Sequence, residues 1–144
     1  MYHYTESGLD NVWLENGYTK RRTPYGVATA VQDVDGLYKV IGRTLALKGH
    51  LTGAEFRFLR KRLGLSQARF AALIGKTEQA VALWERKGNV PETDSRMLCA
   101  IYLEAQDGKF GLKEYLERIA ELDRKAGEKL IFHDTAEGWL PHAA

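Results

Sequence analysis

Hydrophobic residues between residues 51 and 88 recur with helical spacing, and two short breaks interrupt the pattern. Phe56, Leu59 and Leu63 stand at i, i+3 and i+7, which predicts one buried stripe on a first helix. The helix opens with Thr52-x-x-Glu55, a capping box in which each side chain bonds a backbone N–H of the other residue. A first helix is therefore expected from about residue 52 to residue 63.

Two further helices are expected after these breaks. The second begins at Ser66, a favourable N-cap residue. Its inner side is predicted to carry three apolar residues, namely Phe70, Leu73 and Ile74. The third helix begins at Thr77 and is expected to bury Val81 and Trp84. Glu78 lies in its first turn, where a negative charge stabilises the helix dipole.

Two small residues indicate how the second and third helices meet. Ala71 stands where the second helix must approach the third closely, and a larger side chain would hold them apart. Gly75 lies at the break, where a left-handed backbone conformation costs little free energy only for glycine. This order predicts a helix-turn-helix, whose second helix enters the major groove of DNA.

The segment resembles the XRE family, the lambda-repressor and Cro-like DNA-binding domains, over about a quarter of the chain. The matching positions are Leu63-Gly64-Leu65-Ser66-Gln67, Ala71, Gly75, Val81, Trp84-Glu85 and Gly88. The resemblance implies a lambda-repressor-like domain that binds double-stranded DNA in the major groove. Lys76 stands where the family generally has an aliphatic residue, and Ala82 where serine is common. The alternative is a helix-turn-helix that packs helices without touching DNA.

Base contacts are expected from the exposed start of the third helix. The candidates are Thr77, Glu78, Gln79 and Ala82. Gln79 can pair bidentately with adenine, and the Ala82 methyl can meet a thymine methyl.

Phosphate contacts are expected from residues around the same surface. The candidates are Gln67, Arg69, Lys76, Arg86, Lys87 and Asn89. Gln67 opens the second helix, where its amide and the backbone N–H groups can meet a phosphate.

Residues 1–50 predict a small, aromatic-rich α/β module. Short strands are expected at 11–14 and 27–31, and Asn16-Gly17 is a strong turn signal. Lys20-Arg21-Arg22 is predicted to follow in a loop, either as a phosphate-contacting arm or as a solvated segment. A helix should then run to Gly49, a favourable residue after a helix C-terminus.

Beyond residue 90 the pattern favours protein contacts. Thr93 is expected to cap a helix that ends at Gly108, with an apolar stripe formed by Met97, Leu98, Ile101 and Tyr102. A second helix from about 112 to 126 carries the near-heptad stripe Leu112, Tyr115, Leu116, Ile119 and Leu122. This stripe either covers the core of its own domain or forms a dimer interface. We favour the dimer interface, because one helix-turn-helix touches only one half-site. Residues 130–132 are β-prone and predict an edge strand on the N-terminal sheet of the same or a partner subunit, and they would add to the dimer contact.

The chain is expected to divide into modules at 1–50, 51–107 and 108–144, and its charge is unevenly distributed. Residues 51–90 hold eight Lys/Arg against three Asp/Glu, whereas residues 91–144 hold seven against eleven. The whole chain of 144 residues carries a net charge of only +2. A basic centre beside an acidic flank fits one DNA-facing surface, with the remainder turned toward protein or solvent.

The sequence offers no catalytic constellation, and it predicts no cofactor and no metal site. Cys99 is the single cysteine and is expected to be a small buried hydrophobe, and His3 and His50 are isolated in sequence. No apolar run has membrane-spanning length, so a soluble, cytoplasmic protein is expected. The resemblance to the XRE family implies a bacterial or phage-encoded protein.

The predicted fold is mainly α with a small N-terminal β-module. The predicted function is that of a sequence-specific transcriptional regulator, a homodimeric repressor at a palindromic operator. The alternatives are an antitoxin that also binds a toxin, and an interaction module that no longer binds DNA.

Overall fold

The computed structural model describes residues 1–108, 111, 115 and 127–142. The chain forms two compact units. The first consists of Met1–Ile41 with Lys129–Ala144, and the second of Gly42–Glu128. This division differs from the predicted one, because the C-terminal segment joins the N-terminal module.

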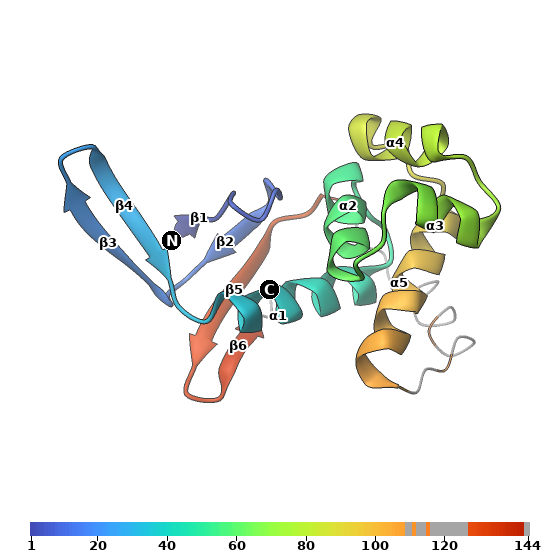
Figure 1. Ribbon diagram of the computed structural model, residues 1–144. Helices are drawn as coiled ribbons and strands as arrows, with labels where there is room; N and C mark the ends of the chain where they lie inside the picture. Colours follow the sequence, from blue (N-terminus) through green and yellow to red (C-terminus); the bar gives the residue numbers. More distant parts are fainter. Residues whose placement is uncertain (109–110, 112–114, 116–126, 143–144) are drawn as a thin grey trace. The chain divides into compact units, whose positions relative to one another are not determined.

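A four-stranded sheet forms the centre of the first unit (Figure 1). Its strands are β1 (Tyr2–His3), β2 (Val12–Leu14), β5 (Leu130–Thr135) and β6 (Gly138–Pro141), in the order β1-β2-β5-β6. Strands β2 and β5 are parallel, and the other neighbours are antiparallel. The predicted strand at 130–132 therefore joins the N-terminal sheet of its own chain, but in its interior, since β6 forms the edge.

The two faces of this sheet differ in burial. Residues pointing to one side are buried, namely Val12, Leu14, Leu130, Phe132 and Trp139. Residues pointing to the other side, which include Trp13, Glu15, Ile131 and His133, are partly or largely exposed. This alternation has the period of two expected of a half-buried strand. Since Leu130 and Phe132 are buried within their own chain, they cannot extend a dimer interface as predicted.

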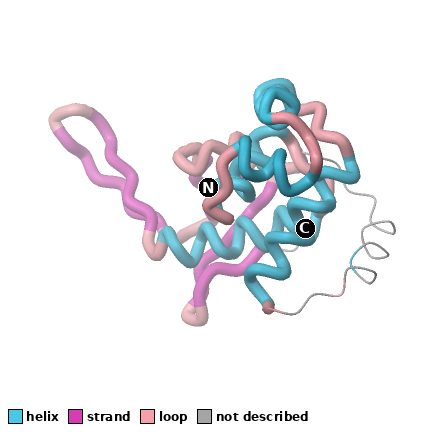
Figure 2. Tube along the Cα trace, turned by 45° about the vertical axis from the view of Figure 1, so that its right-hand side comes forward, coloured by secondary structure: helices cyan, strands magenta, loops and turns pink. Residues whose placement is uncertain are grey.

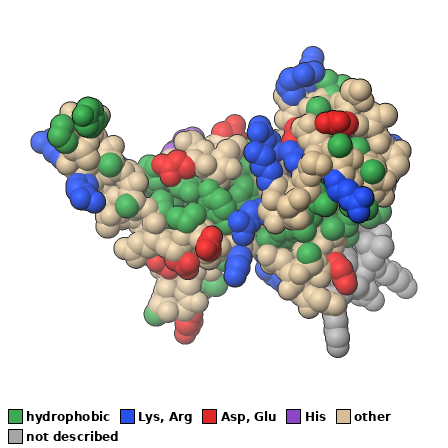
Figure 3. Space-filling view, viewed as in Figure 1, with side chains coloured by type: hydrophobic (Ala, Val, Ile, Leu, Met, Phe, Trp, Pro, Cys, Tyr) green, Lys and Arg blue, Asp and Glu red, His purple; other side chains and the backbone are tan. Residues whose placement is uncertain are grey.

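A separate hairpin follows β2 in the first unit and is formed by β3 (Tyr18–Thr23) and β4 (Gly26–Val31). Most of its residues are exposed, and Figure 2 shows it as a two-stranded ribbon. Lys20-Arg21-Arg22 lies within β3, so its placement in a loop was wrong. The turn at the tip carries the fully exposed Tyr25, and Figure 3 shows hydrophobic side chains gathered there.

Asn16-Gly17 connects β2 to β3 but does not form a hairpin turn between them, because these strands belong to different sheets. The Asn16 side chain continues the β2–β5 pairing, since its Nδ2 donates to the Asp134 carbonyl at 2.9 Å. Gly17 has a φ of 76°, and a Cβ there would collide with the Trp139 ring. The glycine is thus required both by its backbone conformation and by the close approach of Trp139.

Five helices are seen in the described residues. Helix α1 (Val34–Lys48) ends before Gly49, as predicted, and it is divided between the two units after Ile41. Helices α2 (Gly53–Arg62), α3 (Gln67–Ile74), α4 (Glu78–Lys87) and α5 (Glu92–Asp107) belong to the second unit (Figure 1). The mainly helical fold with a small β-module is therefore confirmed.

The core of the second unit is mostly apolar, and it encloses an ion pair between Lys48 and Glu55. Lys48 and Glu55 are both fully buried, and the Lys48 Nζ lies 2.7 Å from each carboxylate oxygen of Glu55. Glu55 also completes the predicted capping box with Thr52. The carboxylate thus compensates the buried ammonium and fixes the start of α2 at the same time.

Helix α5 differs from its prediction at its start and in its stripe. Its N-cap is Pro91 without a side-chain cap, so Thr93 lies inside the helix. Leu98 and Tyr102 are buried, whereas Met97 is 43% exposed. The predicted stripe is wider than the buried face, and its outer members contact solvent.

Cys99 lies on the buried side of α5, as predicted, and is fully enclosed. Burial raises the pKa of its thiol from 9.0 to about 12, because the thiolate would lose its hydration. The group is therefore a neutral packing residue at ordinary pH.

Candidate DNA-binding interface

The three helices α2, α3 and α4 form the predicted helix-turn-helix, and their ends are set by local hydrogen bonds. Ser66 caps α3 by accepting a hydrogen bond from the Arg69 N–H at 3.0 Å. Gly75 ends α3 in the left-handed conformation, with a φ of 70°. Thr77 then caps α4 by accepting from the Ala80 N–H at 3.1 Å. The turn between the two helices is thereby fixed within three residues.

An aromatic cluster holds α4 against the other two helices. The Phe56 ring of α2 packs edge-to-face on Phe70 of α3 at 5.3 Å and on Trp84 of α4 at 6.0 Å. Val81 is fully buried beside them. The predicted inner positions of α4 are confirmed, while Leu73 of α3 is 51% exposed and does not belong to this core.

A buried ion pair also holds α4 against α2. The Arg60 guanidinium meets both carboxylate oxygens of Glu85, at 2.6 and 2.9 Å. Its third nitrogen donates to the Leu65 carbonyl at 2.8 Å, in the turn between α2 and α3. The two side chains are only 7% and 5% exposed. One arginine therefore ties α2, the following turn and α4 together.

Helices α2 and α4 approach each other closely where α2 begins. A Cβ at Gly53 would lie 2.5 Å from the Glu85 carbonyl oxygen and 2.6 Å from that of Trp84. Since both atoms belong to the backbone, neither can move aside easily. Gly53 thus allows the end of α4 to pack against the start of α2.

The candidate base-contacting residues lie together at the start of α4. Thr77, Glu78 and Gln79 are exposed, and Ala82 is half-buried on the next turn. Because Val81 and Trp84 hold the opposite side of α4, this group faces solvent. The arrangement presents a polar helix N-terminus with short side chains around it, which suits contact with base edges.

The candidate phosphate-contacting residues differ in exposure and in the contacts that their side chains make within the protein. Five of them are exposed, namely Arg69, Lys76, Arg86, Lys87 and Asn89. Within the described residues, none of the four basic members forms an ion pair. Gln67 is half-buried, and its Nε2 donates to Glu85 at 3.1 Å. Its side-chain amide thus supports the Arg60–Glu85 pair, and only its place at the start of α3 favours a phosphate contact.

Of the candidate dimer residues, Leu112, Leu116, Ile119 and Leu122 lie outside the described residues. Tyr115 is described and is buried, and its hydroxyl donates to the Ala46 carbonyl at 2.7 Å. Burial also raises the pKa of this hydroxyl well above its ordinary value. Tyr115 therefore packs within its own unit and is not available to a second subunit.

An apolar groove lies in the second unit, between the end of α3 and α5. Its lining includes Leu73, Ile74, Pro91, Met97 and Ile101, with Lys76 and Asp94 beside them. Leu73 was predicted to lie on the inner side of its helix, and Met97 and Ile101 on the apolar stripe of the next amphipathic helix. The helical spacing is correct, but Leu73 and Met97 are exposed and Ile101 is only half-buried.

Comparison with known families decides the class of this unit. Residues 56–99 match the family model HTH_3, described as Helix-turn-helix. The chain contains a helix-turn-helix domain at residues 56–99. In comparisons with curated proteins and with solved structures, nothing matches the chain.

The helix-turn-helix domain indicates DNA binding, and its bounds agree with the structure. The matched range starts inside α2, contains α3 and α4, and ends inside α5. It thus includes all the candidate base-contacting and phosphate-contacting residues. In the described part of the chain, no helix is long and apolar enough to cross a membrane.

Proposed function

We propose that this protein is a sequence-specific DNA-binding regulator of transcription. The observation that carries the proposal is the exposed polar start of α4 held rigidly on a helix-turn-helix domain. Such a helix reads base edges, while basic side chains around it hold the phosphates and set the register. The Arg60–Glu85 pair and the aromatic cluster supply the rigidity that direct readout needs.

The charge of this domain supports the proposal. Residues 51–90 carry a net charge of +5, and Arg69, Lys76, Arg86 and Lys87 are exposed without an ion-pair partner in the described residues. Free basic side chains can release counterions from DNA, whereas paired ones would first have to break an ion pair. A binding mode with several phosphate contacts is expected.

We further propose that the protein binds as a homodimer and acts as a repressor at a palindromic operator. One α4 helix reads only a few base pairs, so a two-fold pair of helices one DNA turn apart, about 34 Å, would supply the missing specificity. The exposed apolar groove lined by Leu73, Met97 and Ile101 supports a protein contact in this unit. The stripe formed by Leu112, Leu116, Ile119 and Leu122 remains part of this proposal.

Selection of bound sequences from random DNA tests the proposed function. The purified full chain should enrich a motif with two-fold symmetry and half-sites about one helical turn apart. Enrichment of a single half-site would retain sequence-specific binding but would contradict the dimer. No enrichment would contradict the regulator and favour the alternative of an interaction module.

Sedimentation of the free protein at micromolar concentration tests the dimer separately. A dimer is expected, and a monomer would mean that two copies pair only when they are bound to the operator.

An antitoxin remains the second candidate function, and its support is the exposed hairpin β3–β4. Its tip exposes Tyr25 completely and Val27 to 63%, an apolar surface that a protein partner can cover.

A further inference from the structure

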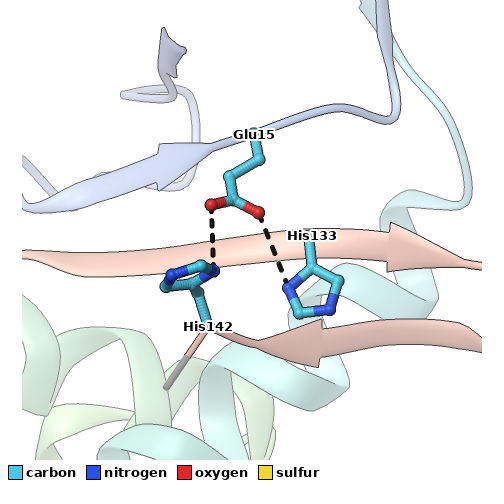
Figure 4. Close-up of side chains that lie close together, drawn as sticks. All are labelled: Glu15, His133 and His142. Carbon is cyan, nitrogen blue, oxygen red and sulfur yellow. Dashed lines mark ion pairs between the residues drawn. The ribbon is translucent and has the colours of Figure 1, made fainter. Parts of the chain in front are cut away.

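Three potential metal ligands meet on the open face of the four-stranded sheet. They are Glu15, His133 and His142, and their ligand atoms all lie within 4.8 Å of one another. Figure 4 shows the Glu15 carboxylate between the two imidazoles, with one oxygen directed toward each ring. No metal site was expected from the sequence, because these residues are far apart in the chain and the sheet brings them together.

Strand register explains why the three side chains share one face. Leu14 pairs with Phe132 in the parallel ladder, so Glu15 and His133 are the next neighbours along the two strands. The Glu15 N–H donates to the Phe132 carbonyl at 2.9 Å and holds this position. On the other side, Phe132 pairs with Pro141, and the His142 N–H donates to the Ile131 carbonyl at 2.8 Å. The backbone therefore places all three residues before any metal binds.

The distances suit a small metal ion. The Glu15 Oε1 lies 2.9 Å from the His142 Nδ1, and the Glu15 Oε2 lies 3.7 Å from the His133 Nδ1. Ligand atoms bound to one tetrahedral ion at 2.0–2.2 Å are separated by roughly 3.3–3.6 Å. Each pair can reach that separation through a small side-chain rotation, without a change in the strands.

One buried atom in this cluster, the His133 Nδ1, has no hydrogen-bond partner among the described residues. Its distance to Glu15 is too long for a hydrogen bond, and a buried polar atom without a partner destabilises the fold. A metal ion between Glu15 and His133 would satisfy this atom.

We propose that Glu15, His133 and His142 bind one divalent transition-metal ion of the Zn²⁺ class. Two imidazole nitrogens and one carboxylate form a ligand set that Zn²⁺ accepts, and the fourth position would hold water. The three side chains are 32–45% exposed, so the ion and its water can reach the site. Bound metal would join the end of β2 to β5 and to the residue after β6, and would thereby fasten the β5–β6 hairpin to β2 within the sheet.

Calorimetric titration of the full chain with ZnCl2 tests this site, after treatment with a chelator and at pH 7.5. One Zn²⁺ per chain is expected, with a Kd at or below about 1 μM. His142→Ala and Glu15→Gln should each weaken binding by at least about tenfold to a hundredfold. Zn²⁺ should also raise the melting temperature of the wild type but not that of these variants.

His3→Ala is the matched control, because His3 lies in the same sheet outside the cluster. Its ring stacks on Trp13, and its Nε2 lies 2.6 Å from the Asp10 carbonyl oxygen. This variant should bind Zn²⁺ as the wild type does. Circular dichroism of each variant shows whether the fold is retained. His142 follows β6, so replacing its side chain should leave the sheet intact.

Two results would overturn the metal site. The first is binding that requires millimolar Zn²⁺ or does not occur, which would leave the cluster as a set of His–Glu ion pairs. The second is equal Zn²⁺ binding by the wild type, His142→Ala and Glu15→Gln. Neither result bears on DNA binding by the helix-turn-helix, so the two proposals can fail separately.

Discussion

Removal of the Glu85 carboxylate is expected to destabilise the helix-turn-helix unit strongly. In Glu85→Ala, the Arg60 guanidinium stays in a site where its side chain is 7% exposed, and among the described residues it keeps only the Leu65 carbonyl as a partner. Breaking a buried ion pair on one side costs about 3–5 kcal/mol. Gln67 loses its acceptor as well, which adds about 1 kcal/mol. The total free energy of unfolding of a small domain is only about 5–15 kcal/mol.

Urea unfolding followed by the helical circular dichroism signal measures this cost, since most of the helix lies in the second unit. The double variant Arg60→Met with Glu85→Leu removes both charges together. It should be closer to the wild type than Glu85→Ala, because no unpaired charge remains buried. Arg96→Ala is the control: its ion pair with Glu92 is exposed, with side chains 27% and 55% accessible, and should contribute less than about 1 kcal/mol.

A free energy of unfolding of Glu85→Ala within about 1 kcal/mol of the wild-type value would contradict the buried ion pair. So would a double variant whose loss of stability equals the sum of the losses of Arg60→Met alone and Glu85→Leu alone, because additivity would mean that the two side chains do not interact.

Three further outcomes are expected. Trp84→Ala should cost about 3–5 kcal/mol and abolish DNA binding through unfolding, whereas a thermal melt within a few degrees of the wild type would contradict the buried anchor. Replacing Arg86 or Lys87 by Ala should weaken binding to all DNA sequences and reduce the slope of log K against log salt by about one unit, while Lys39→Ala in α1 should leave it unchanged. Cys99 should resist thiol reagents at pH 8 until urea unfolds the protein, because burial raises the pKa of its thiol from 9.0 to about 12. Its contribution to stability is lost as the pH rises from 9 to about 12, since the unfolded thiol ionises first. Rapid labelling of the native protein would contradict the burial.

The sequence predicted the helix-turn-helix well because local signals determine it. The capping box at Thr52, the N-caps at Ser66 and Thr77 and the left-handed Gly75 all act within a few residues. Helical spacing also identified Phe56 and Trp84 as buried. It did not separate the core from a neighbouring surface, which is why Leu73 was placed inside the domain.

Contacts between distant segments were not predictable in the same way. The pairing of β2 with β5 joins residues that are more than a hundred positions apart, so the cluster of Glu15, His133 and His142 has no local signature. The Arg60–Glu85 pair is a similar case, because its two residues lie on different helices and 25 positions apart, and no ion pair was predicted between them. The strand at 130–132 was recognised by composition, but its place inside the sheet depended on β6.

The central claim is that the exposed start of α4 reads DNA bases, and Gln79→Ala tests it most directly. The variant should be measured against the selected operator and against a panel in which each base pair is changed in turn. We expect a loss of about 1–3 kcal/mol on the best operator and a relaxed preference at one position of each half-site. Arg86→Ala, measured in parallel, should weaken binding on the whole panel and keep the same preferences. If Gln79→Ala retains the affinity and the base preferences of the wild type, this face of α4 does not read the operator.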